Sequence, residues 1–212
     1  MIRIGLIDGA LPADWPGLAK QRRFCEPDGA PLAETHARAM AETIRSYCEK
    51  SEFINAAVFS GRLSTSIEHV CQALNWFSED PPDIVLCSFG TAKTSLDLSL
   101  LTARLLLANC LVVASSPARG ETVYPAGTPG VVSVQGDARC APFEFSKLDL
   151  PHAEFGACPF VQGYPDIRGA SAAAAHVVGQ MAADLCVKSE LGKEPLKTAI
   201  KYFGRECRSA AE

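Results

Sequence analysis

The feature of this chain that most constrains its fold is an alternation of short apolar runs with amphipathic helical patterns. Apolar runs of strand length lie at residues 2–7, 54–59, 83–88, 110–114 and 131–134. Helical patterns lie between them at residues 35–48, 64–77 and 96–108, and further helices are expected from Ser171 and after Pro195. Such repeated strand–helix–strand crossovers predict a three-layer α/β fold, in which a mostly parallel sheet carries helices on both faces.

Two segments lack these patterns. Residues 9–34 are rich in proline and glycine and are expected to form a loop, whereas residues 136–168 are expected to form loops with a short hairpin. The sequence contains no internal repeat and no low-complexity stretch. We therefore expect residues 1–212 to fold as a single domain.

Composition narrows the classes of function. Apolar residues make up 48% of the 212 residues, charged residues 21%, and the net charge is −4, so no basic surface for nucleic acid is expected. The longest apolar run, residues 105–114, is broken by Asn109 and is too short to span a bilayer. The strand pattern starts directly at the N-terminus without a signal-peptide pattern, which predicts a cytoplasmic protein without membrane contact.

Cysteine is abundant but shows no recognisable framework. The nine cysteines are odd in number and include no C-x-x-C pair. This argues against a disulfide framework and against a structural zinc site, so neither a metal nor a cofactor is expected. Most of the cysteines are interpreted as reduced, buried side chains, with Cys140 and Cys158 the pair to test for a disulfide.

Three residues with acid, base and nucleophile chemistry fall where parallel sheets place their sites, at the carboxyl ends of strands. Asp8 ends the first strand, His36 opens the next helix, and Ser171 opens a later helix. Each has a purely structural alternative. Asp8 could form a turn before Gly9, His36 could be a surface residue at a helix start, and Ser171 could cap a helix whose alanines pack closely against a neighbour.

The motifs around these residues are similar to those of a known family. The stretch 169–179, G-A-S-A-A-A-A-H-V-V-G, resembles the nucleophile signature G-T-S-M-A-A-P-H-V-A-G of the subtilases, the subtilisin-like serine peptidases. Residues 36–44, H-A-R-A-M-A-E-T-I, resemble the histidine motif H-G-T-H-V-A-G-T-I, and L-I-D-G-A at 6–10 resembles the strand-plus-aspartate motif. The order aspartate, histidine, serine is that of the subtilisin triad.

Further blocks between these motifs resemble segments that line the substrate cleft in the family. They are D-I-V-L-C-S-F-G at 83–90, V-V-A-S-S-P-A-R-G at 112–120 and Y-P-A-G-T-P-G-V-V-S-V at 124–134. Together the blocks run in family order from residue 1 to about residue 185. The resemblance thus implies a subtilisin-like fold over most of the chain.

The resemblance also implies a division of roles. Ser171 attacks the scissile carbonyl to form an acyl-enzyme, His36 transfers the proton, and Asp8 orients the imidazolium. An extended peptide substrate would be bound by two segments. They are Ser88, Phe89 and Gly90, through backbone groups, and Ser115, Ser116 and Pro117, which line the pocket for the side chain before the cut.

The chain departs from the family pattern at the oxyanion position, which Ala118 occupies in place of an asparagine. Either the enzyme works slowly, or Ser115, Ser116 or Arg119 supplies the missing donor. Arg119 is interpreted as a solvated loop charge or as a group that favours acidic side chains. The chain is also short and lacks a prosegment, which suits a cytoplasmic protein.

We therefore expect a serine endopeptidase that acts on a dedicated peptide or precursor substrate. The alternative is a catalytically weak or inactive subtilisin-like domain that binds a peptide or partner protein in the same cleft. A third interpretation, a nucleotide-binding α/β protein, would use G-T-A-K-T-S at residues 90–95. That stretch lacks the spacing of a phosphate-binding loop.

Overall fold

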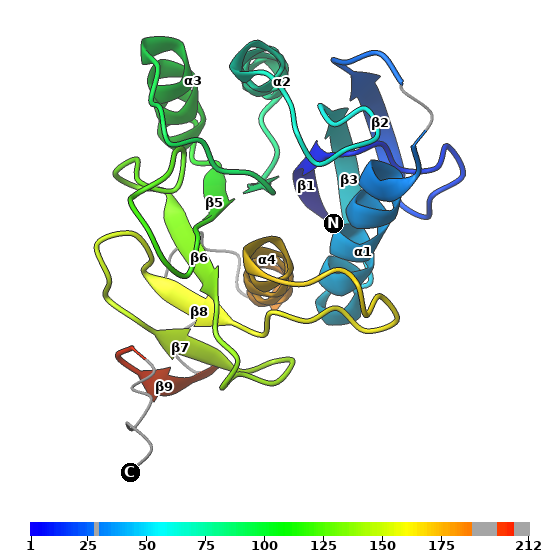
Figure 1. Ribbon diagram of the computed structural model, residues 1–212. Coiled ribbons are helices and arrows are strands. Elements are labelled where there is room, and N and C mark those ends of the chain that lie inside the picture. Colours follow the sequence, from blue (N-terminus) through cyan, green and yellow to red (C-terminus); the bar gives the residue numbers. More distant parts are fainter. Residues whose placement is uncertain (28–29, 188–198, 206–212) are drawn as a thin grey trace.

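The computed structural model describes residues 1–27, 30–187 and 199–205. Within these residues it contains a nine-stranded sheet and four helices (Figure 1). In chain order the elements are β1 (Ile2–Asp8), β2 (Leu18–Arg23), α1 (Leu32–Tyr47), β3 (Ser51–Ala57), α2 (Ile67–Glu79), β4 (Ile84–Cys87), α3 (Leu96–Leu107), β5 (Leu111–Ser115), β6 (Val132–Gly136), β7 (Phe145–Lys147), β8 (Phe155–Ala157), α4 (Ala170–Val187) and β9 (Ile200–Phe203).

The sheet is almost entirely parallel. Its strand order is β2-β3-β1-β4-β5-β6-β8-β7-β9, and the β7–β8 pair is antiparallel. The chain passes from β1 to β3 on one side and then crosses to β4 on the other side of β1. The strand order therefore reverses at β1, and this position becomes important for the site.

Helices cover both faces of the sheet, as the alternation of patterns predicts. Along β1, Ile4 and Leu6 point into the core cluster that contains α1 and α4, whereas Ile7 points into the cluster that contains α2 and α3. Figure 1 shows the same division, with α1 and α4 on one face and α2 and α3 on the other. The predicted three-layer α/β architecture is confirmed.

Helix α4 lies in the core and has a face made of small residues. Residues 172–175, all alanine, are buried to at least 99%. A Cβ added at Gly179 would lie 2.7 Å from Cδ2 of Tyr47 on α1, so only glycine allows this close approach. By length and composition α4 could cross a membrane, but 61% of it is buried within the protein, as in a core helix.

Two edge strands differ from the predictions. β2 forms where a loop was expected, because Leu18–Arg23 is mostly polar and exposed and shows no alternation of apolar residues. The helix expected after Pro195 begins outside the described residues, and Ile200–Phe203 forms β9 instead of a helix. In the irregular region, β7 and β8 form the expected antiparallel hairpin.

The cysteines in the described part of the chain are free thiols, Cys140 and Cys158 among them. Both are buried, and burial raises the pKa of Cys140 to about 12. Two other sulfur atoms do approach each other. Cys48 Sγ, at the end of α1, lies 3.2 Å from Cys186 Sγ, near the end of α4, as a thiol–thiol hydrogen bond.

Candidate active site

The candidate site lies where the strand order of the sheet reverses, at the carboxyl end of β1. In open α/β sheets this is the place where ligands bind, because neighbouring connections leave the sheet in opposite directions. Asp8 is the last residue of β1 and is completely buried. Ser88 follows β4 directly, and its N–H donates to the carbonyl of Ile7 at 3.4 Å. Asp8 and Ser88 therefore lie on adjacent strands of the sheet.

Gly9 allows helix α1 to pack directly onto the end of β1. A Cβ at this position would lie 2.0 Å from the carbonyl oxygen of Ala33, in the first turn of α1, so no other residue fits. His36 follows Ala33 by about one helical turn and therefore faces Asp8. The glycine after Asp8 thus positions the helix that carries His36.

Asp8 and His36 form a buried hydrogen-bonded pair. His36 Nδ1 lies 2.8 Å from Oδ1 and 2.9 Å from Oδ2 of Asp8, and His36 is 5% exposed. The backbone N–H of Gly9 also donates to Oδ1, at 2.7 Å. A carboxylate only accepts hydrogen bonds, so Nδ1 of His36 carries a proton. In the neutral ring Nε2 is then unprotonated and able to accept a proton.

The charge of Asp8 shifts the titration of His36. Burial by itself lowers the pKa of His36, because it disfavours the charged ring. The neighbouring Asp8 carboxylate and its hydrogen bond act in the opposite direction and outweigh burial, so the pKa is raised above its usual value. The imidazolium is thus stabilised where it would form during proton transfer.

Ser171 lies in the first turn of α4 and is half-buried. Gly169, with a left-handed φ of 113°, turns the chain into this helix. The Ser171 hydroxyl donates to the carbonyl of Ser88 at 3.4 Å, and no described contact joins it to His36. The structure therefore pairs Asp8 with His36 and brings Ser171 to the end of β4. A turn of the Ser171 side chain away from Ser88 would be needed before it could donate to His36.

The hydroxyl of Ser88 is the unpaired polar group of this region. It is shielded from solvent and has no hydrogen-bond partner among the described residues. Such groups are rare in folded proteins and are often found at functional sites. Ser88 itself is 7% exposed, so the group lies beneath the surface of the site.

The two segments expected to bind substrate lie side by side. A Cβ added at Gly90 would lie 3.6 Å from the carbonyl oxygen of Ser115 and 2.7 Å from Cγ2 of Val123. Phe89 and Gly90 border a groove of about 410 Å³, whose other wall is formed by residues 63–67. Sequence reasoning missed Val123, because its place against Gly90 depends on pairing between Thr91 and Tyr124.

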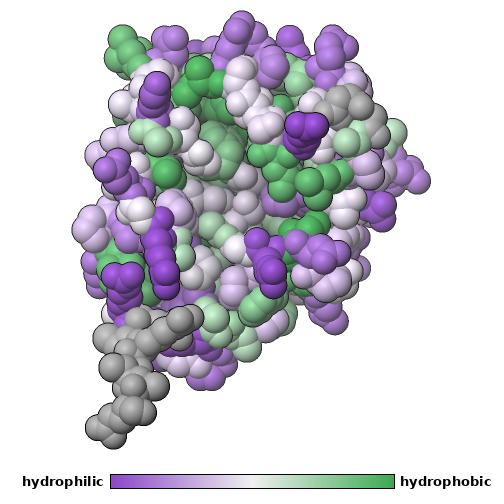
Figure 2. All heavy atoms as spheres, viewed as in Figure 1, coloured by the Kyte–Doolittle hydropathy of each residue, from purple (hydrophilic) through white to green (hydrophobic). Residues whose placement is uncertain are grey.

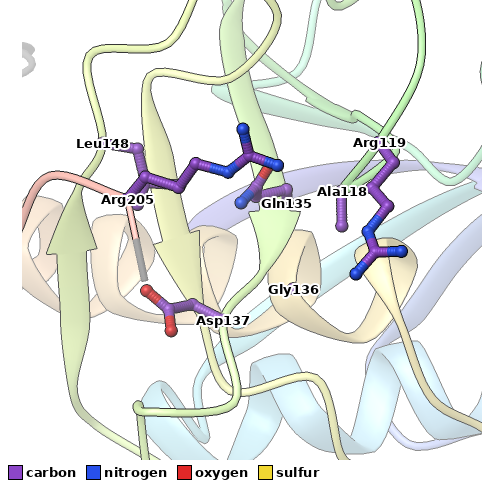
Figure 3. Close-up of a pocket in the computed structure, with 7 residues that line it drawn as sticks. All are labelled: Ala118, Arg119, Gln135, Gly136, Asp137, Leu148 and Arg205. Carbon is purple, nitrogen blue, oxygen red and sulfur yellow. The ribbon is translucent and has the colours of Figure 1, made fainter. Parts of the chain in front are cut away.

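The remaining predicted residues differ in exposure. Ser115 and Ser116 are buried, and their hydroxyls donate to the carbonyls of Cys87 and His152. Pro117 is half-buried, while Ala118 is exposed and lines a pocket of about 310 Å³ with Arg119 (Figure 3). Both serine hydroxyls thus already have carbonyl acceptors.

Figure 2 shows the surface of one face of the molecule. Seen in the direction of Figure 1, the middle of this face is hollowed and carries side chains of weak hydropathy, and strongly polar side chains gather around the rim (Figure 2). Within residues 1–27, 30–187 and 199–205, no group of three or more His, Cys, Asp or Glu side chains is placed to hold a metal ion.

Comparison with known proteins gives a structural match but no sequence match. No protein-family model matches the chain, and no curated protein matches it in sequence. The chain is similar in structure to the prenylagaramide maturation protease PagA, with a TM-score of 0.66 and 18% sequence identity. The match covers 92% of this chain and 78% of that one. The chain therefore shares the overall fold of that protease, and the three-layer, mostly parallel α/β class expected from its sequence is confirmed.

Proposed function

We propose that this protein is a serine endopeptidase that cleaves peptide bonds through an acyl-enzyme on Ser171. His36 is the general base and Asp8 orients and stabilises its ring. The observation that carries the proposal is the buried Asp8–His36 pair at the reversal point of the sheet. Ser171, at the start of α4, supports it because its hydroxyl donates to the carbonyl of Ser88, which follows the adjacent strand β4. A maturation protease with the same fold adds support.

The proposed reaction proceeds in two halves. The Ser171 hydroxyl leaves the Ser88 carbonyl, donates its proton to Nε2 of His36, and its oxygen attacks the scissile carbonyl. The imidazolium returns that proton to the leaving amine, and the acyl group remains on Ser171. A water molecule then gives a proton to His36 while its oxygen attacks the acyl carbon. The ester bond to Ser171 breaks, the acid leaves, and the imidazolium returns the proton to the Ser171 oxygen.

The substrate we propose is a dedicated peptide or precursor protein that binds in extended form. The backbone of Ser88, Phe89 and Gly90 continues from β4 and offers groups to which an added strand can pair. The groove beside Phe89 has room for a side chain of that strand. We further propose a cytoplasmic location, because the free thiols in the described residues suit a reducing compartment.

Two observations favour the alternative of a catalytically weak domain that binds a peptide in the same cleft. The Ser171 hydroxyl is engaged by the Ser88 carbonyl, and position 118 has no side-chain donor. A binding domain would hold peptide without turnover. It would also fail to react with a fluorophosphonate, a probe that labels only activated serines.

Activity is expected to fall at low pH, with an apparent pKa above the ordinary histidine value of 6.5. Protonated His36 cannot act as base, and Asp8 raises the pKa at which this form appears. The profile of kcat/KM against pH measures this value in the free enzyme. In Asp8→Asn the residual activity should show its acid limb at lower pH, because burial remains and the neighbouring charge is lost.

The same shift has a consequence for stability. Because the pKa of His36 is higher in the folded than in the unfolded protein, protonation of the ring stabilises the folded state. This stabilisation is fully present below the unfolded pKa and is lost as the pH rises through the folded pKa.

The kinetic prediction has a contradicting outcome. An acid limb of the pH profile that is unchanged in Asp8→Asn would contradict the assignment of His36 as the base that Asp8 controls.

Ala118→Asn is expected to raise kcat about 10²-fold with little change in KM. The resemblance implies two donors to the oxyanion, the backbone N–H of Ser171 and a side-chain amide at position 118. An alanine supplies no such donor, and a donor that acts mainly in the transition state affects kcat more than KM. Steady-state kinetics of Ala118→Asn and of the control Ala13→Asn, at an exposed alanine elsewhere, measure the effect.

A substitute donor would give a different result. In that case Ala118→Asn should change little, and alanine at Ser115, Ser116 or Arg119 should lower turnover about 10²-fold. If none of the four variants changes turnover, position 118 does not lie at the oxyanion.

A further inference from the structure

A positively charged pocket lies next to the proposed nucleophile. Its volume is about 310 Å³, and its lining comes from the loop after β5, the end of β6 with the residue after it, the residue after β7, and Arg205, the second residue after β9 (Figure 3). Arg205 extends across it from one side and Arg119 from the other, with Gln135 and Ala118 between them (Figure 3). Two arginines from distant parts of the sequence thus line one pocket from opposite sides.

These two arginines have no counter-ion in the described part of the chain. Arg119 and Arg205 make no hydrogen bond or ion pair with any described residue. Asp137, the acidic residue of the pocket, is already neutralised. It accepts from Arg139 at 2.7 Å and from the hydroxyl of Ser146 at 2.6 Å. The pocket therefore has a net positive charge that no described carboxylate offsets.

Gln135 adds an oriented amide to the pocket. It is 8% exposed, and its Oε1 accepts from Nε2 of His152 at 3.3 Å. The amide N–H groups of Gln135 are left without a described partner, so they are available as donors on the pocket side. The backbone before Arg205 is fixed by two hydrogen bonds of Gly204. The carbonyl of Gly204 accepts from the Arg139 guanidinium at 2.8 Å, and the N–H of Gly204 donates to the carbonyl of Lys147.

The pocket is within reach of a peptide bound at Ser171. A Cβ built on Gly136, which lines the pocket, would lie 3.6 Å from the carbonyl carbon of Gly169, two residues before Ser171. An extended peptide advances about 3.3 Å per residue. A substrate carboxylate in the pocket would therefore belong to one of the four residues nearest the cut bond, two on each side of it.

We propose that this pocket binds the carboxylate of an acidic substrate side chain next to the scissile bond, through Arg119, Arg205 and the Gln135 amide. Guanidinium groups suit this role because their planar donors match a carboxylate and remain charged at any working pH. The inference rests on the proposed peptidase function and adds a substrate class to it: peptides with aspartate or glutamate beside the cut.

A positional peptide library first identifies one sequence that the protein cleaves. Pairs of internally quenched peptides are then made from that sequence. Each pair carries Asp or Asn at one of the four residues that flank the cut, so that shape is matched and only charge differs. We expect kcat/KM to favour Asp about tenfold or more at one position. Arg119→Gln and Arg205→Gln should each reduce that ratio several-fold, while Arg104→Gln, an exposed arginine on α3, should not.

The ratio separates this role from a role in the oxyanion hole. A guanidinium that stabilises the oxyanion would lower turnover of Asp and Asn peptides equally in Arg119→Gln, which would overturn the proposal. Equal cleavage of both peptides at all four positions by the wild-type protein would also overturn it, while the peptidase assignment would stand. Charge reversal gives a second check: Arg119→Glu should favour Lys over Asp at the same position.

A binding assay keeps the proposal testable if no peptide is cleaved. Fluorescently labelled Asp and Asn peptides are titrated with the Ser171→Ala protein. The proposal is supported if the Asp peptide binds more tightly than the Asn peptide and if this difference disappears in the Ser171→Ala, Arg119→Gln double variant. Equal binding would overturn it. Inorganic phosphate serves as the competing probe: if it binds through Arg119 and Arg205 while Asp peptides show no preference, the pocket takes a free anion and not a substrate side chain.

Discussion

Ser171→Ala is expected to abolish covalent labelling by a fluorophosphonate probe and to lower turnover by about 10⁴-fold or more. The probe reacts only with a serine whose proton is taken up by a base as the bond to phosphorus forms. In the proposed mechanism that base is His36, paired with Asp8, and alanine at position 171 removes the oxygen that would form the bond. Intact-protein mass spectrometry measures the label directly.

The fold should survive this substitution. The Ser171 hydroxyl makes a single long hydrogen bond of 3.4 Å, and alanine is a better helix former than serine. The midpoint of thermal unfolding should therefore stay close to that of the wild type. Ser99→Ala, at a half-buried serine on α3, is the matched control and should keep full labelling. A label that persists in Ser171→Ala places the nucleophile elsewhere.

Asp8→Asn is expected to lower turnover by about 10⁴-fold while leaving the fold intact. The amide has nearly the same shape as the carboxylate, but its N–H can donate to Nδ1 of His36. The ring proton then moves to Nε2, where the base must be free, and the imidazolium loses the charge that stabilises it. The effect should appear mainly in kcat, measured with a peptide that the wild type cleaves.

A second aspartate of the same sheet provides the control for Asp8→Asn. Asp83 precedes β4 at the opposite end of the strands, and its carboxylate accepts from the backbone N–H of Arg3 at 2.8 Å. Asp83→Asn removes a charge of the same kind without touching the site, so turnover should change little. Turnover of Asp8→Asn within tenfold of the wild type would show that Asp8 acts only as a structural residue.

The core strands and the helices were predictable because burial leaves a periodic pattern in the sequence. β4 is a continuous apolar run, and β1 and β5 are mostly apolar, as is typical of strands covered on both faces. The positions of Asp8 and Ser171 followed from the same logic, since a polar residue at the end of such a run or at the start of a helix lies at the sheet edge. The local sequence pattern thus predicted much of the fold.

Features that depend on contacts between distant segments were not predictable in this way. β2 and β9 are edge strands whose exposed, mixed residues are defined by the strand they pair with, not by their own pattern. The contact of Gly9 with Ala33 had no signal other than the glycine itself. Likewise, no sequence spacing relates Arg205 to Arg119, because only the β7–β9 pairing brings that end of the chain to the pocket.

The place of Ser171 in the last buried helix has a consequence for the timing of activity. Asp8 and His36 are 28 residues apart in the chain, whereas the hydroxyl of Ser171 contacts Ser88, which lies 83 positions away. During synthesis the segment that carries Asp8 and His36 emerges well before Ser171, so the proposed nucleophile is the last of the three residues to be made. The proposed protease activity would then begin only when α4 has packed its alanines into the core. The regain of probe reactivity during refolding would time that event.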